Sequence, residues 1–152
     1  MLNLVFIVCN FLNLSNILLT INSNKIIQVI DKELLYNNNN IIINYESRIK
    51  SGARIIKKIQ KNKIPYDIYG LRIIYNDIQN YHNSEFAYTI KNILTSNFNT
   101  LDFLYDDYIV HPKANNYQSL HLYVLTNILI EIQIRNSFMH NVSVNGTASN
   151  YY

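Results

Sequence analysis

The residues most able to do chemistry lie in two short runs near the C-terminal end of the chain. Residues 106–121 read DDYIVHPKANNYQSLH, and residues 130–135 read IEIQIR. In a nucleotide site, a lysine binds phosphate, amide and hydroxyl groups bind the polar edges of a base, and an aromatic ring stacks on its face. A core strand needs none of these groups, so the first run favours a nucleotide site over packing.

The second run alternates between apolar and polar side chains, which is the period of a β-strand. A polar strand face is exposed to solvent in many antiparallel sheets, and it can also line a cleft. Because the first run is so close in sequence, we favour the cleft. The alternation predicts that two sets of side chains point to opposite faces: Ile130, Ile132 and Ile134 on one, and Glu131, Gln133 and Arg135 on the other.

Basic residues are concentrated in the middle of the chain. Eight of the thirteen lysines and arginines lie between Arg48 and Arg72, against one acid, Asp67. The resulting local excess of +7 suits a polyanion, either a nucleoside triphosphate or a nucleic acid. A solvated helix face is the usual alternative for a run of charges, and we expect Lys57, Lys61 and Lys63 to belong to such a face.

The elements that must position these residues follow from the apolar pattern. Residues 1–24 carry no charge, and their polar positions form one stripe, which predicts an amphipathic helix that packs on the core. Its many amides argue against a membrane span. A targeting segment over residues 1–24 is the alternative, although the segment lacks the basic residues and the cleavage site of a signal peptide. Residues 25–36 predict a second helix.

The rest of the chain mixes strands and helices. Residues 51–62 predict a helix capped by Ser51, with Ile55, Ile56 and Ile59 directed inward. Residues 81–94 predict another helix and residues 95–100 a loop, whereas residues 139–152 show no strong period. The predicted strands are residues 41–46, 67–75, 119–125 and 129–135, the last two forming a hairpin. We therefore expect an α+β (α/β-like) layered fold with a mixed β-sheet of about five strands flanked by helices.

Composition excludes several other classes of protein. The 152 residues are 49% hydrophobic and 15% charged, which is typical of a globular domain with a sizeable core. The single cysteine, Cys9, excludes an intrachain disulfide and a zinc site built from several thiolates. The four histidines show no spacing typical of metal ligands.

The two polar runs closely resemble motifs of the RelA/SpoT alarmone synthetases. The first resembles their G-loop, DY-x-x-x-PK-x-N-x-YQS-x-H, and the second their E-x-Q-I-R strand. The resemblance extends through most of residues 41–150: residues 48–51 are similar to R-x-K-S/H, and residues 67–72 to D-x-x-A/G-x-R, with Gly70 in the small-residue position. It implies a nucleotidyltransferase-like synthetase fold, an N-terminal helical segment over residues 1–40 and a synthetase domain over residues 41–152.

The resemblance also implies a reaction and a set of roles. A Mg²⁺-dependent pyrophosphokinase would move the β,γ-diphosphate of ATP to the 3′-hydroxyl of GDP or GTP. Asp67 and Glu131 would hold Mg²⁺, and Glu131 could also be the base. Four basic residues would bind ATP, the arginines around adenine and the lysines at the phosphates: Arg48, Arg72, Lys50 and Lys58. Six residues would bind GDP or GTP, with Tyr117 stacked on guanine: Lys113, Asn115, Tyr117, His121, Gln133 and Arg135.

The chain departs from the family pattern in several places. Asp106-Asp107 is similar to the acidic Glu-x-Asp-Asp form of synthesis-only members, although Leu104 replaces its glutamate. Asn116 replaces a glycine, so we expect a left-handed backbone there, which Asn tolerates better than most residues. Asp67 and Arg72 would point to opposite faces of a regular strand, so Asp67 must lie at its start or beside a bulge. The ending M-H-x-x-A-E-x-G-x-A-A-H is matched only in part, at residues 139–150.

Other interpretations stay open. The acceptor could be the 3′ end of tRNA, as in toxin-like relatives of the family, although GDP or GTP is the preferred assignment. The chain could also be a nucleotide-binding module without turnover, because its ending is eroded. We expect a cytoplasmic protein, with organellar or secretory targeting through residues 1–24 as the alternative. Small members of the family assemble as tetramers, so a homo-oligomer is also open.

Overall fold

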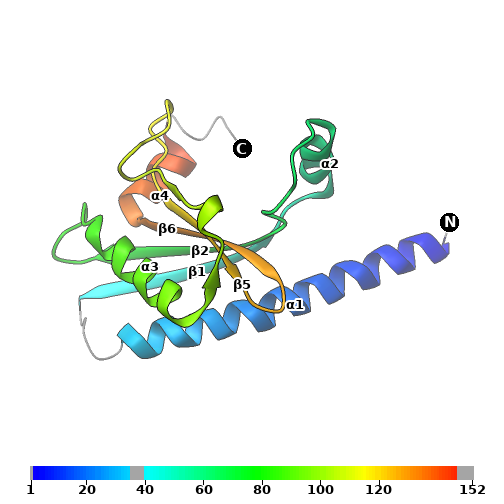
Figure 1. Cartoon of the computed structure of the whole chain (residues 1–152), viewed down its shortest axis with the longest axis horizontal. Helices are drawn as coiled ribbons and strands as arrows, with labels where there is room; N and C mark the ends of the chain where they lie inside the picture. The colour runs from blue at the N-terminus through cyan, green and yellow to red at the C-terminus, as the bar shows by residue number, and fades with distance from the viewer. Residues whose placement is uncertain (1, 35–39, 147–152) are drawn as a thin grey trace.

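The computed structural model describes residues 2–34 and 40–146, and its centre is one mixed β-sheet. Strand β1 (Ile41–Ile49) pairs antiparallel with β2 (Tyr69–Asp77), and β2 pairs parallel with β6 (Leu129–Asn136). β6 pairs antiparallel with β5 (Leu120–Leu125). The short strands β3 (Asn99–Thr100) and β4 (Asp106–Asp107) both pair with β5. The sheet has six strands in the described chain, which confirms the predicted fold class with one strand more than expected (Figure 1).

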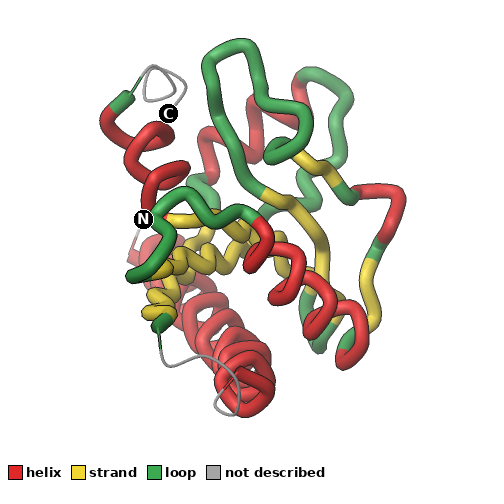
Figure 2. The backbone as a smooth tube through the Cα atoms, turned by 90° about the vertical axis from the view of Figure 1, so that its left-hand side faces the viewer, coloured by secondary structure: helices red, strands yellow, loops and turns green. Residues whose placement is uncertain are grey.

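Two helices cover one face of this sheet. α1 (Leu2–Leu34) runs along it and α3 (Glu85–Asn97) packs beside α1. Figure 2 shows α1 nearly end-on below the strands. On the opposite side, α4 (Ser137–Asn145) lies against β2 and β6 (Figure 1), while α2 (Gly52–Gln60) stands at one end of the sheet. A 3₁₀ helix, η1 (Asp102–Leu104), links β3 to β4.

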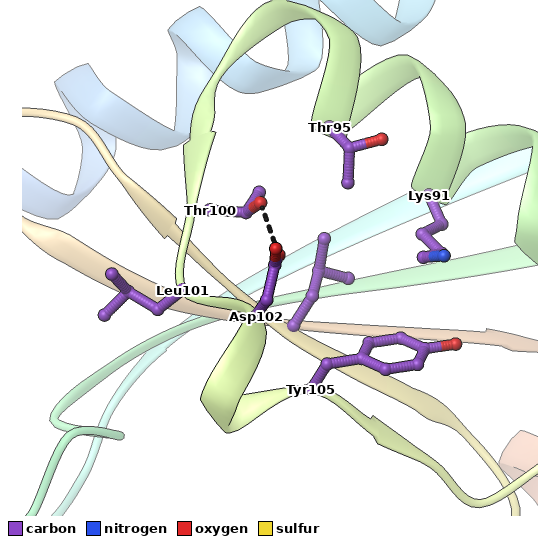
Figure 3. A pocket seen from close by; sticks show the side chains of 7 residues that line it. Lys91, Thr95, Thr100, Leu101, Asp102 and Tyr105 are labelled. Atoms are coloured by element: carbon purple, nitrogen blue, oxygen red, sulfur yellow. Dashed lines mark hydrogen bonds between the residues drawn. The ribbon is translucent and has the colours of Figure 1, made fainter.

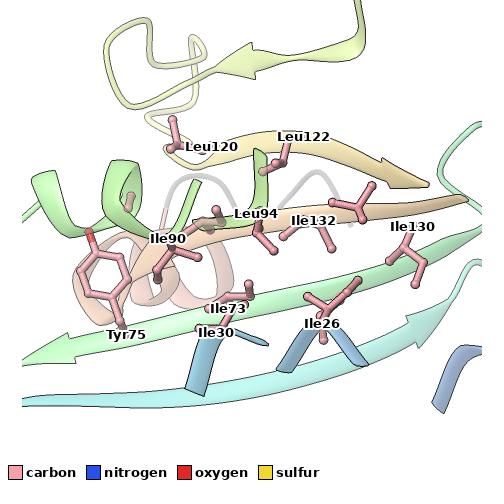
Figure 4. Close-up of a cluster of buried hydrophobic side chains, with 14 of the residues drawn as sticks. Ile26, Ile30, Ile73, Tyr75, Ile90, Leu94, Leu120, Leu122, Ile130 and Ile132 are labelled. Carbon is pink, nitrogen blue, oxygen red and sulfur yellow. The ribbon is translucent and has the colours of Figure 1, made fainter. Parts of the chain in front are cut away.

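The core lies between the covered face and the two helices. Alternate residues of β2, β5 and β6 point into it, as the strand period requires. Figure 4 shows these side chains meeting Ile26 and Ile30 of α1 and Ile90 and Leu94 of α3. The strand residues are all almost fully buried: Leu71, Ile73, Tyr75, Leu120, Leu122, Val124, Ile130, Ile132 and Ile134. The predicted inward face of the last strand is therefore confirmed.

The N-terminal segment forms one helix, so the prediction of two helices was wrong. Two of its polar side chains are accommodated by bonding back to carbonyls one turn earlier. Thr20 Oγ1 donates to Asn16 O at 2.9 Å, and Asn22 Nδ2 donates to Leu18 O at 2.8 Å. Asn22 is fully buried and also accepts from the N–H of Asn127. None of the described helices is long and apolar enough to cross a membrane.

The inward orientation expected for three isoleucines of α2 was also wrong. The helix begins after Ser51, as predicted, but the Ser51 side chain makes no capping hydrogen bond and the helix has no buried residue. Ile56 and Ile59 are each 56% exposed, and Ile55 is only half-buried. The amphipathic period is real, but α2 stands at the end of the sheet and contributes nothing to the core cluster of buried residues. Lys57, Lys61 and Lys63 are exposed, as expected.

Other element boundaries differ for local reasons. α3 begins at Glu85 rather than near residue 81, because Asn83 Oδ1 accepts from the N–H groups of Glu85 and Phe86. It ends at Asn97 and is followed by β3, so residues 95–100 are not simply a loop. α4 was not predicted, although Asn136 caps it by accepting from the N–H of Met139 at 2.8 Å. Residues 147–150 of the partly matched ending lie outside the described residues.

Candidate functional site

The face of the sheet opposite α1 carries a row of polar side chains across four strands. The register pairs Arg48 of β1 with Gly70 of β2, and Gly70 with Glu131 of β6. Tyr123 of β5 follows beside Glu131. Two residues further along each strand, the same face presents a second row, which contains Glu46, Arg72, Gln133 and His121. The strand period thus gathers residues far apart in the sequence on one surface.

Glu131 lies at the centre of this surface and is 5% exposed. Its Oε2 accepts from Arg48 Nη2 at 3.2 Å and from Gln133 Nε2 at 3.0 Å. Its Oε1 lies 3.3 Å from His121 Nδ1 and accepts from the Tyr123 hydroxyl at 3.4 Å. Burial opposes ionisation of the carboxyl, but the His121 hydrogen bond and the nearby charges of His121 and Arg48 outweigh it and lower its pKa. Glu131 is therefore a buried carboxylate at neutral pH.

Asp67 is the second buried acid, in the turn that leads into β2. It pairs with Lys50 and, at 2.8 Å from Oδ1, with Lys58 Nζ. Burial again opposes ionisation, but hydrogen bonds from both lysines hold the pKa of Asp67 below its ordinary value. The two acids are close enough for the charge of Asp67 to raise the pKa of Glu131, against the effects of His121 and Arg48. The position of Asp67 before the first residue of β2 confirms the expectation that it lies at the strand's start.

The two arginines predicted to hold adenine lie on this same face. Arg48 pairs with Glu131, whereas Arg72 donates from Nη1 to Glu46 Oε2 at 2.6 Å and from Nε to Gln133 Oε1 at 3.4 Å. Strands β1 and β2 are neighbours, and Arg48 lies opposite Gly70, two residues before Arg72. Glu131 therefore holds one guanidinium group and Glu46 holds the other. Together with Lys50 and Lys58, these groups make the surroundings of Asp67 and Glu131 strongly cationic.

Residues 108–119, which we call the acceptor loop, fold back on themselves beside this face. Asn115 Oδ1 accepts from the N–H of Tyr117 at 3.3 Å. Asn116 has a φ of 62°, which confirms the predicted left-handed backbone. Lys113 Nζ lies 4.2 Å from the ring centre of Tyr108 and 5.2 Å from that of Tyr117. The loop thus has a defined conformation, with the cation of Lys113 over two aromatic rings.

Tyr117 is only 5% exposed, so its ring offers little surface to a base in this structure. Its hydroxyl lies 2.8 Å from His121 Nε2, and the ring meets those of Tyr108 and His121 edge to face. Arg135 lies on another side, with its Cζ 5.8 Å from the ring centre. The hydroxyl connects the acceptor loop to Glu131, because His121 contacts both Tyr117 and Glu131.

Arg135 lies further along β6 than the acid pair and is 1% exposed. Its Nη2 donates to His140 Nδ1 on α4 at 3.0 Å. Burial and the charge of Arg135 lower the pKa of His140, so this imidazole is a neutral acceptor. Arg135 therefore joins α4 to the neighbourhood of Tyr117, where Lys113 and Asn115 also lie. The other predicted residues with a direct contact to the two acids are Arg48, His121 and Gln133 at Glu131, and Lys50 and Lys58 at Asp67.

The structure adds two residues that the sequence did not single out. Tyr123 contacts Glu131 directly, and Glu46 holds Arg72. Tyr123 could have been found by strand alternation, because it lies two residues after His121 and shares its face. Glu46 could not, because its role depends on the pairing of β1 with β2, which places it opposite Arg72.

The acid pair is the part of this surface that suits a metal. The described residues contain no group of three or more His, Cys, Asp or Glu side chains placed to hold an ion. Mg²⁺ needs no such group, since it usually binds one or two carboxylates together with water and substrate phosphates. Asp67 and Glu131 supply oxygen donors of the required kind, both buried and near enough for the charge of Asp67 to act on Glu131. The donor set therefore fits Mg²⁺.

Comparison with protein families and curated proteins gives consistent matches. A model described as "Region found in RelA / SpoT proteins" matches residues 47–152. A GTP pyrophosphokinase of Photobacterium angustum is 31% identical over 118 residues, which are 74% of this chain and 15% of that protein. A GTP pyrophosphokinase of Haemophilus influenzae is 35% identical over 103 residues, 64% of this chain and 13% of that protein. The chain thus spans about a seventh of the length of these relatives.

The chain also matches solved structures of shorter proteins, and it covers a larger share of each of them. Small alarmone synthetase 2 of Bacillus subtilis superposes with a TM-score of 0.67 and 29% identity, covering 88% of this chain and 75% of that one. Small alarmone synthetase 1 of Bacillus subtilis, bound to its product pppGpp, gives a TM-score of 0.63 and 26% identity, with coverage of 82% and 71%. The mixed sheet with flanking helices is therefore the architecture of these neighbours.

Proposed function

This chain belongs to the RelA/SpoT family, and from that premise we propose that it is a pyrophosphokinase that makes guanosine tetra- or pentaphosphate. The β,γ-diphosphate of ATP is transferred to the 3′-hydroxyl of GDP or GTP, and AMP is released. The observation that carries this proposal is the pair of buried carboxylates, Asp67 and Glu131, set among four cationic side chains on one face of the sheet.

The donor side of the site takes ATP. Phosphoryl-type transfer depends mainly on positioning and on neutralising charge, which is what this surface offers. Lys50 and Lys58 bind the phosphates, and Arg48 and Arg72 bind adenine, for which the planar guanidinium group is suited. Asp67 and Glu131 hold Mg²⁺, which supplies charge neutralisation at the phosphates when it is bound. The contacts of the two lysines to Asp67 keep them at the site before ATP arrives.

The acceptor side takes the guanosine nucleotide. The 3′-oxygen attacks the β-phosphorus of ATP, the bond from that phosphorus to the α,β-bridging oxygen breaks, and Glu131 accepts the hydroxyl proton. The lowered pKa of Glu131 keeps it ionised, so that it is able to accept a proton. His121 and Tyr123 orient its Oε1. Gln133 orients its Oε2.

The acceptor loop and Arg135 recognise the base and the phosphates. Guanine takes the place of Lys113 over the ring of Tyr117, which requires the loop to open from the enclosed state seen here. Lys113 then binds phosphate, and Asn115 and His121 contact polar groups of the nucleotide. Arg135 supports Tyr117 from the side of α4.

An assay with γ-labelled ATP tests the reaction. The protein is incubated with Mg²⁺ and with GDP, GTP or tRNA, while AMP release and label transfer are followed. AMP together with labelled guanosine polyphosphate supports the proposal. Label on tRNA supports the toxin-like reaction instead, and nucleotide binding without AMP indicates a module without turnover.

The role of Glu131 is tested by Glu131→Gln. Removing a general base typically costs about 10²- to 10⁴-fold in rate, and we expect a loss of this order with nucleotide binding retained. Glu85→Gln is the matched control, because it makes the same chemical change at an exposed position of α3. Unchanged turnover in Glu131→Gln would exclude Glu131 as the base.

A further inference from the structure

Asp107 has an unusual number of partners for a side chain outside the acid pair. Its Oδ1 accepts from the N–H groups of Ile109 and Val110, both at 3.0 Å. Its Oδ2 accepts from the hydroxyl of Tyr88 at 2.9 Å and from that of Tyr105 at 3.2 Å. One carboxylate thus joins the first turn of the acceptor loop to two tyrosines outside it.

The two tyrosines come from different parts of the fold. Tyr88 lies on α3, which packs on the apolar face of the sheet, and Tyr105 lies between η1 and β4. Burial, with a smaller contribution from the Asp107 carboxylate, raises the pKa of Tyr88 to about 12. Burial opposes ionisation of Asp107, but these two hydroxyls and the two loop amides outweigh it and lower its pKa. At neutral pH the hydroxyls therefore keep their protons and Asp107 stays ionised, so the hydroxyls donate to a carboxylate.

The surroundings of Tyr105 make its hydrogen bond to Asp107 more important. Figure 3 shows its ring among the side chains that line a pocket, with Lys91 above it. The pocket has a volume of about 430 Å³. Lys91 Nζ lies 4.8 Å from the ring centre. The ring also packs against the core. Where it borders the pocket, the hydroxyl bond to Asp107 and the contact with Lys91 hold its position.

We propose that Tyr88 and Tyr105 are positioning residues that, acting through Asp107, hold the acceptor loop in place beside Glu131. The inference rests on the proposed function of that loop. Few residues separate Asp107 from Glu131. Asp107 pairs with Leu120 and Asp106 with His121 in the β4–β5 ladder, and His121 contacts Glu131. A change at the tyrosines therefore acts on the loop from its first residues, without touching either nucleotide pocket.

The test uses variants that remove only the hydroxyl groups: Tyr88→Phe, Tyr105→Phe and the double variant. The rings and their packing remain, so the fold is expected to be kept. Tyr45→Phe is the matched control, since its hydroxyl donates to Asp31 at 2.7 Å, far from the loop in sequence. The first measurement is hydrogen–deuterium exchange at the amides of Ile109 and Val110. We expect at least about tenfold faster exchange in the double variant, as for loss of a hydrogen bond to a charged group, and no change in Tyr45→Phe.

The second measurement separates the two nucleotide pockets. In the double variant we expect the KM for GDP or GTP to rise by about tenfold while the KM for ATP stays within about twofold, because the donor residues do not contact the loop. Equal effects on both KM values, or unchanged exchange at Ile109 and Val110, would overturn the proposal. If the protein shows no transfer activity at all, the proposed function fails, but the exchange measurement still decides whether the tyrosines hold the loop.

Discussion

The side chain of Arg48 lies directly over Gly70 on the neighbouring strand. A Cβ atom placed on Gly70 would be 3.1 Å from Arg48 Nε and 3.2 Å from its Cγ, which is closer than such atoms normally pack. The absence of a side chain at this position therefore lets Arg48 cross β2 and reach Glu131 on β6, where the ion pair measures 3.2 Å.

Gly70→Ala is expected to weaken ATP binding by about three- to tenfold, or about 1 kcal/mol, because Arg48 must move by a few tenths of an ångström away from its place. Isothermal titration with ATP measures the effect. Gly52→Ala is the matched control, since nothing lies within 4 Å of a Cβ at that position. Equal ATP affinity in the two variants would show that the position of Arg48 is unimportant for the donor pocket.

Ile132 and Ile56 predict opposite outcomes for the same substitution. Ile132 is fully buried in the core, so Ile132→Ala is expected to reduce the free energy of unfolding by about 2–5 kcal/mol. Ile56 is 56% exposed on α2, where alanine is the better helix former, so Ile56→Ala should stay within about 0.5 kcal/mol of the wild type. Urea denaturation measures both. A large loss in Ile56→Ala would mean that α2 packs against another surface in solution.

His140 predicts a pH dependence of stability. Burial and the charge of Arg135 lower its pKa in the folded protein, whereas the unfolded chain keeps a value near about 6.5. The unfolded state then binds more protons, so stability rises with pH, and the contribution of His140 is lost as the pH falls below about 6.5. His140→Gln keeps an acceptor for Arg135 but does not titrate.

The comparison is made by urea denaturation at pH 7.5, 6.5 and 5.5. We expect the wild type to lose free energy of unfolding relative to His140→Gln as the pH decreases through this range. Parallel profiles for the two proteins would show that His140 has the same pKa in both states.

The backbone at Asn116 predicts a preference for residues that tolerate the left-handed region at this position of the acceptor loop. Its φ of 62° lies in the left-handed region, where a β-branched side chain is strained by about 1–2 kcal/mol and glycine is not. Asn116→Gly should keep the stability of the wild type, and Asn116→Val should reduce it by that amount in thermal or urea unfolding. Asn44→Val, on an exposed strand position, is the control and should cost nothing. A harmless Asn116→Val would mean that the loop adopts another backbone conformation.

The sequence predicted the parts of the fold and site that depend on local patterns. The hairpin of β5 and β6 and the two faces of β6 follow from alternation. The left-handed backbone at Asn116 follows from its place at a glycine position of the family motif. The place of Asp67 before β2 followed from its spacing to Arg72. These features need only neighbouring residues, so a single sequence contains the information.

Features that depend on distant partners could not be predicted. The apolar stripe of α2 has the period of a buried helix, but only the tertiary structure reveals that nothing covers Ile56. The enclosure of Tyr117 depends on Lys113 and Arg135, which approach it from the loop and from β6. The hydrogen bond of Asp107 with Tyr88 depends on a residue of α3 that has no sequence signal of its own.

The place of β6 in the sheet also determines when the sheet can be completed during translation. This strand is synthesised after all the others, yet it lies between β2 and β5. Until it leaves the ribosome, the strands on either side wait with unpaired backbone groups and uncovered isoleucines and leucines, which favour association with other chains. The nascent polypeptide therefore exposes these edges until β6 has been synthesised, and removing β6 would leave β2 and β5 each with an open edge.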